Sequence, residues 1–471
     1  MSTAAPAPNK APPPARPAEP YTKAFARFEQ EESGAQPAWL WPVRQAGLSR
    51  FAQLGFPTLR QEDWRFTNVS AIAKLPFHPA TRRPPEAASA AAATARLSAG
   101  RLEQFPLTRL PGPRLVFVDG RFHPALSRLP AQPDGIEIGP LTAALAGNNP
   151  ALEAHLRKAA SSEDNAFAAL NSAFFHDGGF IHVPAGRTVE GIVQLIFVST
   201  TTEPGHTTHP RNLIQVDRQA RLTVLESYFA TVSAPTVTNA VTEFVLGDQA
   251  VVEHCKFQDE SPEAYHLATL PSHLGNGVNF SSHSIVTGAR LSRNNIRTLL
   301  DGEGIECILN GVYLTDRDQV ADHHMIVDHA KPHCASHEYF NGILAGRSKG
   351  VFHGRILVRP GAQKTDAKQT NKNLLLSDDA TADAKPQLEI YADDVKCTHG
   401  ATIGQLNPES IYYLRSRGIG LETARRMLIH SFAGEIIDRV KQDALREELD
   451  RLLWDRLEQL AGIAAGTPAI P

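Results

Sequence analysis

The chain has 471 residues, of which 42% are hydrophobic and 21% charged, and its formal net charge is -3. The length predicts two or three domains, and the composition is typical of a globular protein. The charge excludes the strong basic field of many nucleic-acid-binding proteins, and no apolar run reaches the roughly 18–20 residues of a membrane helix. Four scattered cysteines without a C-x-x-C pair indicate no disulfide framework, which favours the reducing cytoplasm.

The N-terminal third predicts a tail followed by helices. Residues 1–20 are rich in Ala and Pro, which favours a disordered tail over a signal or transit peptide. Residues 21–160 predict a small helical domain with long connections. An apolar stripe at helical spacing runs from Val43 to Leu54, and Gly55 supplies a helix stop.

Residues 161–405 predict a β-domain. Short apolar runs, such as 213–216 and 388–391, alternate with polar ones and are separated by turn-forming residues. A sandwich, a barrel and a β-solenoid all fit this pattern, and no strict repeat selects among them. The polar stretch 365–384 is predicted to be a loop.

Residues 406–463 predict a C-terminal helical domain, followed by a tail at 464–471. Asn407 is a suitable N-cap, and Gly418 ends the first short helix. Longer apolar stripes begin near Leu421 and Leu445, and they must be buried either against the β-domain or against a partner.

The segment 393–404 holds a candidate half-site for a metal. In a strand, Cys397 and His399 at positions i and i+2 point to the same face. Thiolate and imidazole are both good ligands for iron and zinc, but they are only half of a tetrahedral set. A small buried cysteine and a hydrogen-bonded histidine are the plainer alternative.

Two other clusters have plainer explanations. Segment 323–337 is rich in histidine, and a zinc site there would need three or four ligands to converge, so histidines on a sheet surface are favoured. A glycan-cleaving enzyme would need clustered carboxylates, but solvated loop charge is favoured for four aspartates, Asp366, Asp378, Asp379 and Asp383. The chain lacks a phosphate-binding loop, so nucleotide-driven work would need a separate ATPase.

Several long motifs resemble the SufB/SufD family of iron–sulfur cluster assembly proteins. The segment 56–68 is similar to the one that marks SufD rather than SufB. The remaining similar segments are 351–356, 369–377, 386–390, 393–404 and 412–419.

The resemblance implies a right-handed parallel β-helix flanked by N- and C-terminal helical domains, which selects the solenoid. It also implies a scaffold subunit without its own catalysis or nucleotide site, which pairs with SufB through the β-helix. Homodimer formation stays open. The SufC ATPase would bind the C-terminal helical region, and we expect that contact at Tyr412, Tyr413, Arg417, Gly418 and Leu421.

The resemblance also gives the half-site a function. His399 matches a SufD histidine at the SufB–SufD interface, and Cys397 matches a cysteine whose role is open. The implied function is to receive iron and to support a transient iron–sulfur cluster shared with the partner. A polysaccharide-active β-helix enzyme and a zinc protein using 323–337 remain the alternatives.

Overall fold

The computed structural model describes residues 18–32, 36–80, 97–131, 135–147, 149–161 and 164–464. Most of both expected tails therefore lies outside the described residues, and the first helix begins at Ala18. Among the described residues, no helix combines the length and the apolar character needed to cross a membrane.

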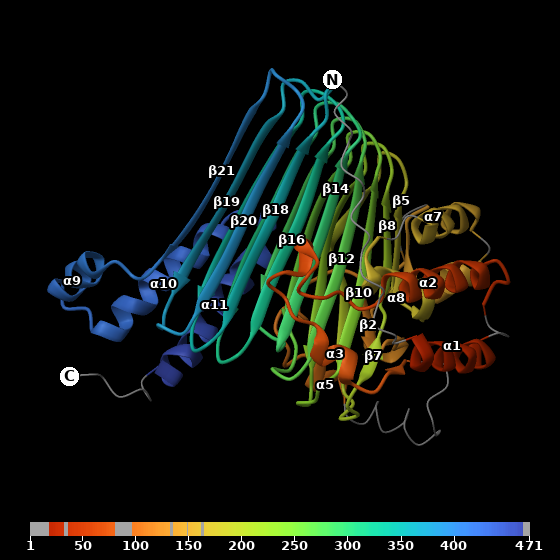
Figure 1. Cartoon of the computed structure of the whole chain (residues 1–471), viewed down its shortest axis with the longest axis horizontal. Coiled ribbons are helices and arrows are strands. Elements are labelled where there is room, and N and C mark those ends of the chain that lie inside the picture. The colour runs from red at the N-terminus through yellow and green to blue at the C-terminus, as the bar shows by residue number, and fades with distance from the viewer. Residues whose placement is uncertain are drawn as a thin grey trace, which may run out of the picture.

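Two long sheets, most of whose strands are parallel, form the body of the molecule (Figure 1). The first sheet contains, in spatial order, β20 (Thr381–Ile390), β18 (Lys349–Val358), β16 (Val320–His329), β14 (Leu291–Leu300), β12 (Tyr265–Leu274), β10 (Val237–Leu246), β8 (Arg211–Val216), β5 (Gly179–Val183) and β4 (Glu137–Pro140), with β7 (His206–Thr208) beside β10 and β1 (His78–Pro79) beside β7. The second sheet contains β21 (Lys396–Gly404), β19 (Asp366–Leu375), β17 (Ala335–Leu344), β15 (Glu306–Thr315), β13 (Asn279–Val286), β11 (Val251–Asp259), β9 (Arg221–Ala230), β6 (Thr188–Ser199), β2 (Arg114–Val118) and β3 (Arg121–Phe122).

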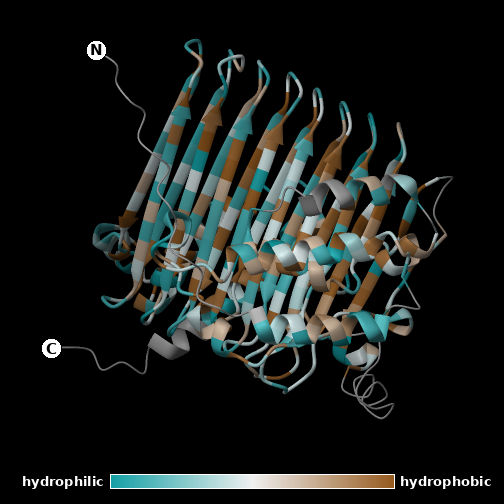
Figure 2. Cartoon of the chain, turned by 45° about the vertical axis from the view of Figure 1, so that its right-hand side comes forward, coloured by the Kyte–Doolittle hydropathy of each residue, from teal (hydrophilic) through white to brown (hydrophobic). Residues whose placement is uncertain are grey.

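The chain passes from one sheet to the other and back, so each coil stacks on the one before it. About eight coils lie between residues 180 and 404, which confirms the predicted β-solenoid. Hydropathy alternates along many strands, as Figure 2 shows, because alternate side chains point into the solenoid.

A single column of residues in the first sheet shows how stacking buries the core. Parallel pairing places equivalent positions of successive coils side by side. Val358 is fully buried by the coil that follows it, whereas its register partner Ile390, in the last coil, is 39% exposed. The earlier members of the column are Val183, Val216, Leu246, Leu274, Leu300 and His329.

The N-terminal region is mixed rather than purely helical, because β2 and β4 extend the two sheets. Its helical elements are α1 (Ala18–Glu32), α2 (Leu40–Leu54), η1 (Glu62–Trp64), α3 (Ser70–Lys74), α5 (Ala99–Leu102), η2 (Pro124–Leu126), α6 (Leu141–Ala146), α7 (Pro150–Ser161) and α8 (Ala166–Phe174).

Helix α8 is buried at every position and packs against α2 and the first sheet. Gly47 allows this approach, since a Cβ there would lie 2.8 Å from the Ala169 carbonyl oxygen. Gly55 ends α2 with a φ of 63°, as predicted from the sequence.

At the C-terminus, α9 (Pro408–Ser416) precedes α10 (Leu421–Ile437) and α11 (Asp443–Ala464). The last two pack on the outer face of the second sheet, so the apolar stripe that begins at Leu445 belongs to the core. Gly418 follows the end of α9 with a φ of 84°.

The polar stretch 365–384 is not a loop, and that prediction was wrong. It forms all of β19 and the first part of β20. Inward-facing Gln369 and Asn371 find hydrogen-bond acceptors inside the solenoid, on Glu338 and on the Phe340 backbone, so these strands need no apolar alternation.

The two ends of the solenoid finish differently. At the N-terminal end, the sheets close with short antiparallel strands, β3 of two residues and β4 of four. At the C-terminal end they finish with β20 of ten residues and β21 of nine, and β21 is exposed at every position except the half-buried Cys397.

Candidate functional site

The half-site lies on the last strand of the solenoid. The segment around Cys397 and His399 forms β21, as a shared face requires. Their register partners on β19, Ala367 and Gln369, are both buried inside the solenoid. Cys397 and His399 therefore continue an inward-facing row that no further coil among the described residues covers.

The two side chains differ in their surroundings. Cys397 packs against a small apolar cluster that includes Ile356 and Leu388, and partial burial raises the pKa of its thiol. His399 is exposed. Within the described residues, no third His, Cys, Asp or Glu converges with them. The pair offers one sulfur and one nitrogen to a metal or cluster and leaves other coordination positions to groups from elsewhere.

A polar row leads from the half-site into the solenoid. Gln369, beside His399, donates a hydrogen bond of 2.7 Å from Nε2 to Glu338 Oε2. Burial raises the pKa of Glu338 to about 7 and outweighs the hydrogen bond from Gln369, which lowers it. The interior next to the uncovered end is thus polar, and Glu338 changes its protonation state near neutral pH.

The histidine-rich segment 323–337 does not form a zinc site of its own. His323 lies inside the solenoid, where Nε2 is 3.0 Å from Ser284 Oγ, and His329 is bonded to Ser336 Oγ at 2.8 Å. The prediction that these histidines lie on a sheet surface was wrong for both, because alternate positions of β16 face the core. His324 points to the outer face.

A second group of potential metal ligands was not predicted from the sequence. Asp63 of η1 lies against His324 of β16 and His353 of β18, on the outer face of the first sheet. The two histidines are one coil apart, a spacing of about 30 residues that becomes informative only once the solenoid is known.

The aspartates weighed for a glycan-cleaving site do not gather in one place. Asp383 pairs with Lys349 at 2.7 Å, and Asp366 lies 3.8 Å from His337. None belongs to a group of three potential ligands among the described residues.

The expected partner contacts lie on and beside α9, which projects away from the solenoid (Figure 1). No residue of this helix is buried, and its Tyr412 and Tyr413 are 76% and 58% exposed. Arg417 lies over the Tyr413 ring, 5.2 Å from its centroid, and Leu421 is exposed at the start of α10. The structure brings all five predicted partner residues together on one projection.

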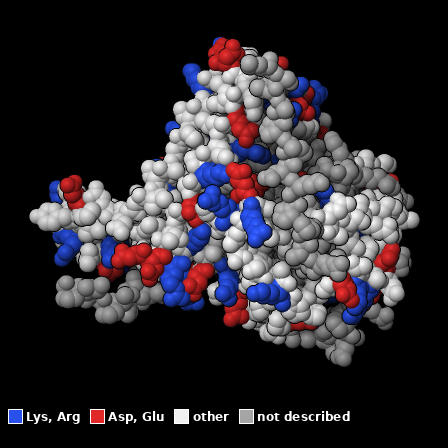
Figure 3. All heavy atoms as spheres, in the orientation of Figure 1, with Lys and Arg blue, Asp and Glu red and all other residues white. Residues whose placement is uncertain are grey.

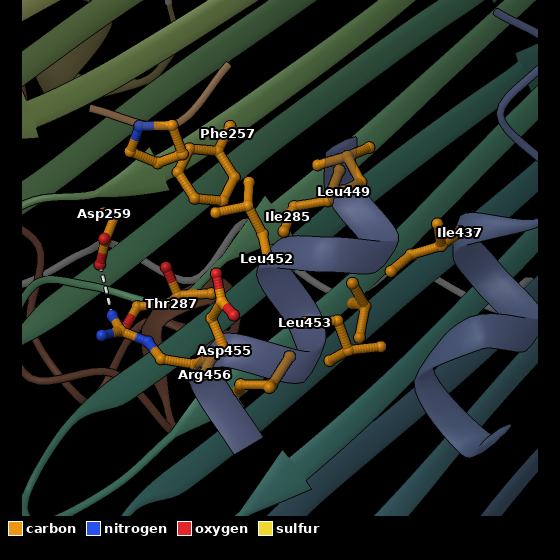
Figure 4. A pocket seen from close by; sticks show the side chains of 13 residues that line it. Phe257, Asp259, Ile285, Thr287, Ile437, Leu449, Leu452, Leu453, Asp455 and Arg456 are labelled. Carbon is orange, nitrogen blue, oxygen red and sulfur yellow. Dashed lines mark hydrogen bonds and ion pairs between the residues drawn. The ribbon is translucent and has the colours of Figure 1, made fainter. Parts of the chain in front are cut away.

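An apolar pocket of about 200 Å³ lies away from both sites, between α11 and the second sheet (Figure 4). Leu449 and Leu453 line it from the helix, and Phe257 lines it from β11. Arg456 closes one side through an ion pair with Asp259. Its walls belong to the core between helix and sheet.

The charges on the surface are mixed. On the face drawn in Figure 3, Lys and Arg lie among Asp and Glu and form no continuous basic field. This agrees with the near-neutral net charge and gives no footprint for nucleic acid on that face.

By its fold, the chain is a β-solenoid protein with one uncovered end and a projecting C-terminal helix. The model of the SUF system FeS cluster assembly SufBD core domain matches residues 197–432, and the SufBD protein N-terminal region matches residues 16–195. The chain therefore belongs to the SufBD family of the SUF system for iron–sulfur cluster assembly.

Individual relatives match over most of the chain. An iron-sulfur cluster assembly SufBD family protein of Synechocystis is 32% identical over 88% of this chain and 91% of its own length. The iron-sulfur cluster assembly protein SufD of Escherichia coli is 30% identical over 88% of this chain and 93% of its own. SufD of Bacillus subtilis is 26% identical over 61% of this chain and 66% of its own.

Proposed function

We propose that the chain is a non-enzymatic scaffold subunit that pairs with a SufB homologue and supports the formation of a nascent iron–sulfur cluster. The observation that carries this proposal is the uncovered end of the solenoid, where Cys397 and His399 share a face. Membership of the SufBD family supports a role in iron–sulfur cluster assembly. The incomplete ligand set at Cys397 and His399 supports a site that is shared with a partner chain.

Pairing through β20 and β21 would complete the last coil. Long exposed edge strands are sites of pairing with another chain, and natural proteins usually shorten or cover them. Both strands have free edges, and Ile390 and Ile403 expose apolar surface there, the latter at 52%. A partner solenoid placed end to end would bury this surface and continue the backbone hydrogen bonds. A second copy of this chain could use the same end when the partner is absent.

The projecting helix α9 is the proposed contact for a SufC-type ATPase. Exposed tyrosines next to an arginine are typical of energetically important contact residues. Tyr412, Tyr413 and Arg417 form such a set, and Gly418 and Leu421 adjoin it. ATP would be hydrolysed by that partner in the cytoplasm.

Sparse ligation suits a cluster that must leave again. Two ligands from this chain would hold iron or a nascent cluster less tightly than a complete set of four thiolates. His399 is the firmer candidate, because it is exposed at the uncovered end. Cys397 is half-buried with a raised thiol pKa, so iron must displace its proton before it can bind.

The test is His399→Ala in the complex, co-expressed without oxygen with the SufB and SufC homologues. We expect iron and acid-labile sulfide per complex to fall about tenfold, a loss typical of removing one ligand or its support. Pairing should persist, as judged by co-purification. The control is His273→Ala, which changes a half-exposed histidine of a central coil. Normal iron and sulfide in the His399 variant would contradict the proposed role.

A further inference from the structure

Three potential ligands from three separate elements meet on the outer face of the first sheet. They are Asp63 of η1, His324 of β16 and His353 of β18, and one ligand atom of each lies within 4.8 Å of the other two. His324 and His353 are register partners on neighbouring strands, with ring centroids 4.3 Å apart. The segment 56–68, whose sequence is similar to that of SufD proteins, brings the carboxylate to them.

Residues on both sides of Asp63 in the sequence fix its segment to the first sheet. Thr67 Oγ1 donates to Asp322 on β16, and the guanidinium of Arg293 lies 3.7 Å from the centre of the Trp64 ring. Glu62 forms an ion pair with Lys385 on β20. In Figure 1 this segment, coloured orange, crosses in front of the strands near β16. These contacts of Glu62, Trp64 and Thr67 fix the position of the Asp63 carboxylate relative to the sheet.

The His353 imidazole has the hydrogen-bonding state that a metal ligand needs. His353 Nε2 lies 2.7 Å from Gln387 Oε1, which can only accept, so Nε2 carries the proton and Nδ1 keeps its lone pair. Ligating histidines commonly have such an outer partner. His324 is 5% exposed, and its buried Nε2 faces Asp63 Oδ1 at a distance of 3.3 Å.

An ion pair between Asp63 and His324 would fasten the segment without a metal. It leaves one feature unexplained, namely the second imidazole packed edge-on against the first. The neighbouring charges of Lys385 and Arg293 are already matched by Glu62 and by Asp322. One cation between the three ligand atoms would satisfy the carboxylate and both rings together.

We propose that Asp63, His324 and His353 form a binding site for a divalent first-row transition metal. Two imidazole nitrogens and one carboxylate oxygen suit Zn²⁺ or Fe²⁺, and the half-exposed Asp63 leaves room for water at the remaining positions. The metal fastens the segment that carries Asp63 to β16 and β18. This site is separate from the uncovered end and does not depend on pairing with a partner.

The test uses the untagged full-length chain, stripped with a chelator and titrated with Zn²⁺, and with Fe²⁺ under anaerobic conditions. Calorimetry and metal analysis after gel filtration count the bound ions. A background of Cys397→Ser with His399→Ala excludes binding at the uncovered end. We expect one ion per chain in this background and at least about 100-fold weaker binding in Asp63→Asn, because one of three protein ligands is lost.

Asp301→Asn is the matched control, since Asp301 pairs with His273 at 3.0 Å on the surface and no third potential ligand among the described residues joins them. It should bind as the background does. Thermal unfolding with and without Zn²⁺ is the second measurement, and the metal should raise the midpoint in the background but not in Asp63→Asn. Absence of binding in the background, or equal binding and equal metal-induced shifts in Asp63→Asn, would overturn the site and leave only an ion pair.

Discussion

The two ends of the solenoid are built from the same kind of coil but are finished in opposite ways. At the N-terminal end, β3 and β4 are short and antiparallel, and apolar residues such as Phe117 are buried. At the C-terminal end, β20 and β21 are long, and Ile403 is 52% exposed. Stacked repeats need a cap at each end to be stable in water. The missing cap is the feature on which the proposed pairing rests.

The largest expected difference between the ends concerns stability. Phe117 is 1% exposed and stacks on Phe197 with ring centroids 4.8 Å apart. Phe117→Ala should lower the free energy of unfolding by about 3–5 kcal/mol, as for other buried aromatic residues. Ile403→Ala in the isolated chain should change it by less than about 0.5 kcal/mol. Chemical denaturation of both variants measures the contrast, and comparable losses would mean that the C-terminal end is covered in the free chain.

The second prediction concerns pairing. Ile403→Asp places an unpaired charge where a partner coil would bury it, so affinity for a SufB homologue should fall by at least about 100-fold. The fold of the free chain should be unchanged. Leu129→Asp, at an exposed leucine of the N-terminal region, is the matched control. Titration by interferometry or calorimetry separates the two, and unchanged affinity in the Ile403 variant would remove β21 from the interface.

The third prediction is a pH dependence of stability. Glu338 has a pKa of about 7 in the folded chain and near 4.5 when unfolded. Between these values the folded state holds the extra proton, so the contribution of Glu338 to stability falls as the pH rises. Glu338→Gln should match the natural chain at about pH 4 and exceed its stability by up to about 3 kcal/mol at about pH 8.

Denaturation curves across this pH range measure the effect, and the exposed Glu263→Gln serves as the control. A stability difference between the natural chain and Glu338→Gln that does not change with pH would show that the pKa of Glu338 is the same in the folded and the unfolded chain.

The smallest expected effect concerns α9. Tyr412→Ala should weaken binding of a SufC-type ATPase by about 10–30-fold, equivalent to about 1.4–2 kcal/mol, with no effect on pairing through β21. Leu59→Ala changes another exposed large residue and should bind normally. Pull-down and titration with the purified ATPase compare the two. Loss of pairing in the Tyr412 variant would mean that the two surfaces are not independent.

The sequence predicted the helix–strand–helix order, since strand and helix periodicities depend on local pattern. It did not by itself select a solenoid, because coils of unequal length hide the repeat, and only the resemblance to a family did so. The β19 and β20 region was mistaken for a loop for a physical reason. Its inward-facing Gln369 and Asn371 are satisfied by contacts with an adjacent coil, which local pattern cannot reveal.

The two candidate sites also differ in whether local sequence alone could predict them. Cys397 and His399 are two residues apart on one strand, so a local rule put them on one face. Asp63, His324 and His353 meet only through the stacking of coils and the return of an N-terminal segment. Their separation in sequence gives no sign of contact until the register is known.

The last two helices connect coils that lie far apart along the solenoid. Residues of α10 and α11, and of the short link between them, are tied to widely separated coils. Glu435 pairs with Lys372 on β19 at 2.9 Å, the backbone N–H of Lys441 donates to Glu253 on β11 at 2.6 Å, and Arg456 pairs with Asp259. The two helices thus brace the second sheet along its length. A force applied to α9 would therefore be distributed over several coils instead of acting on the last coil alone.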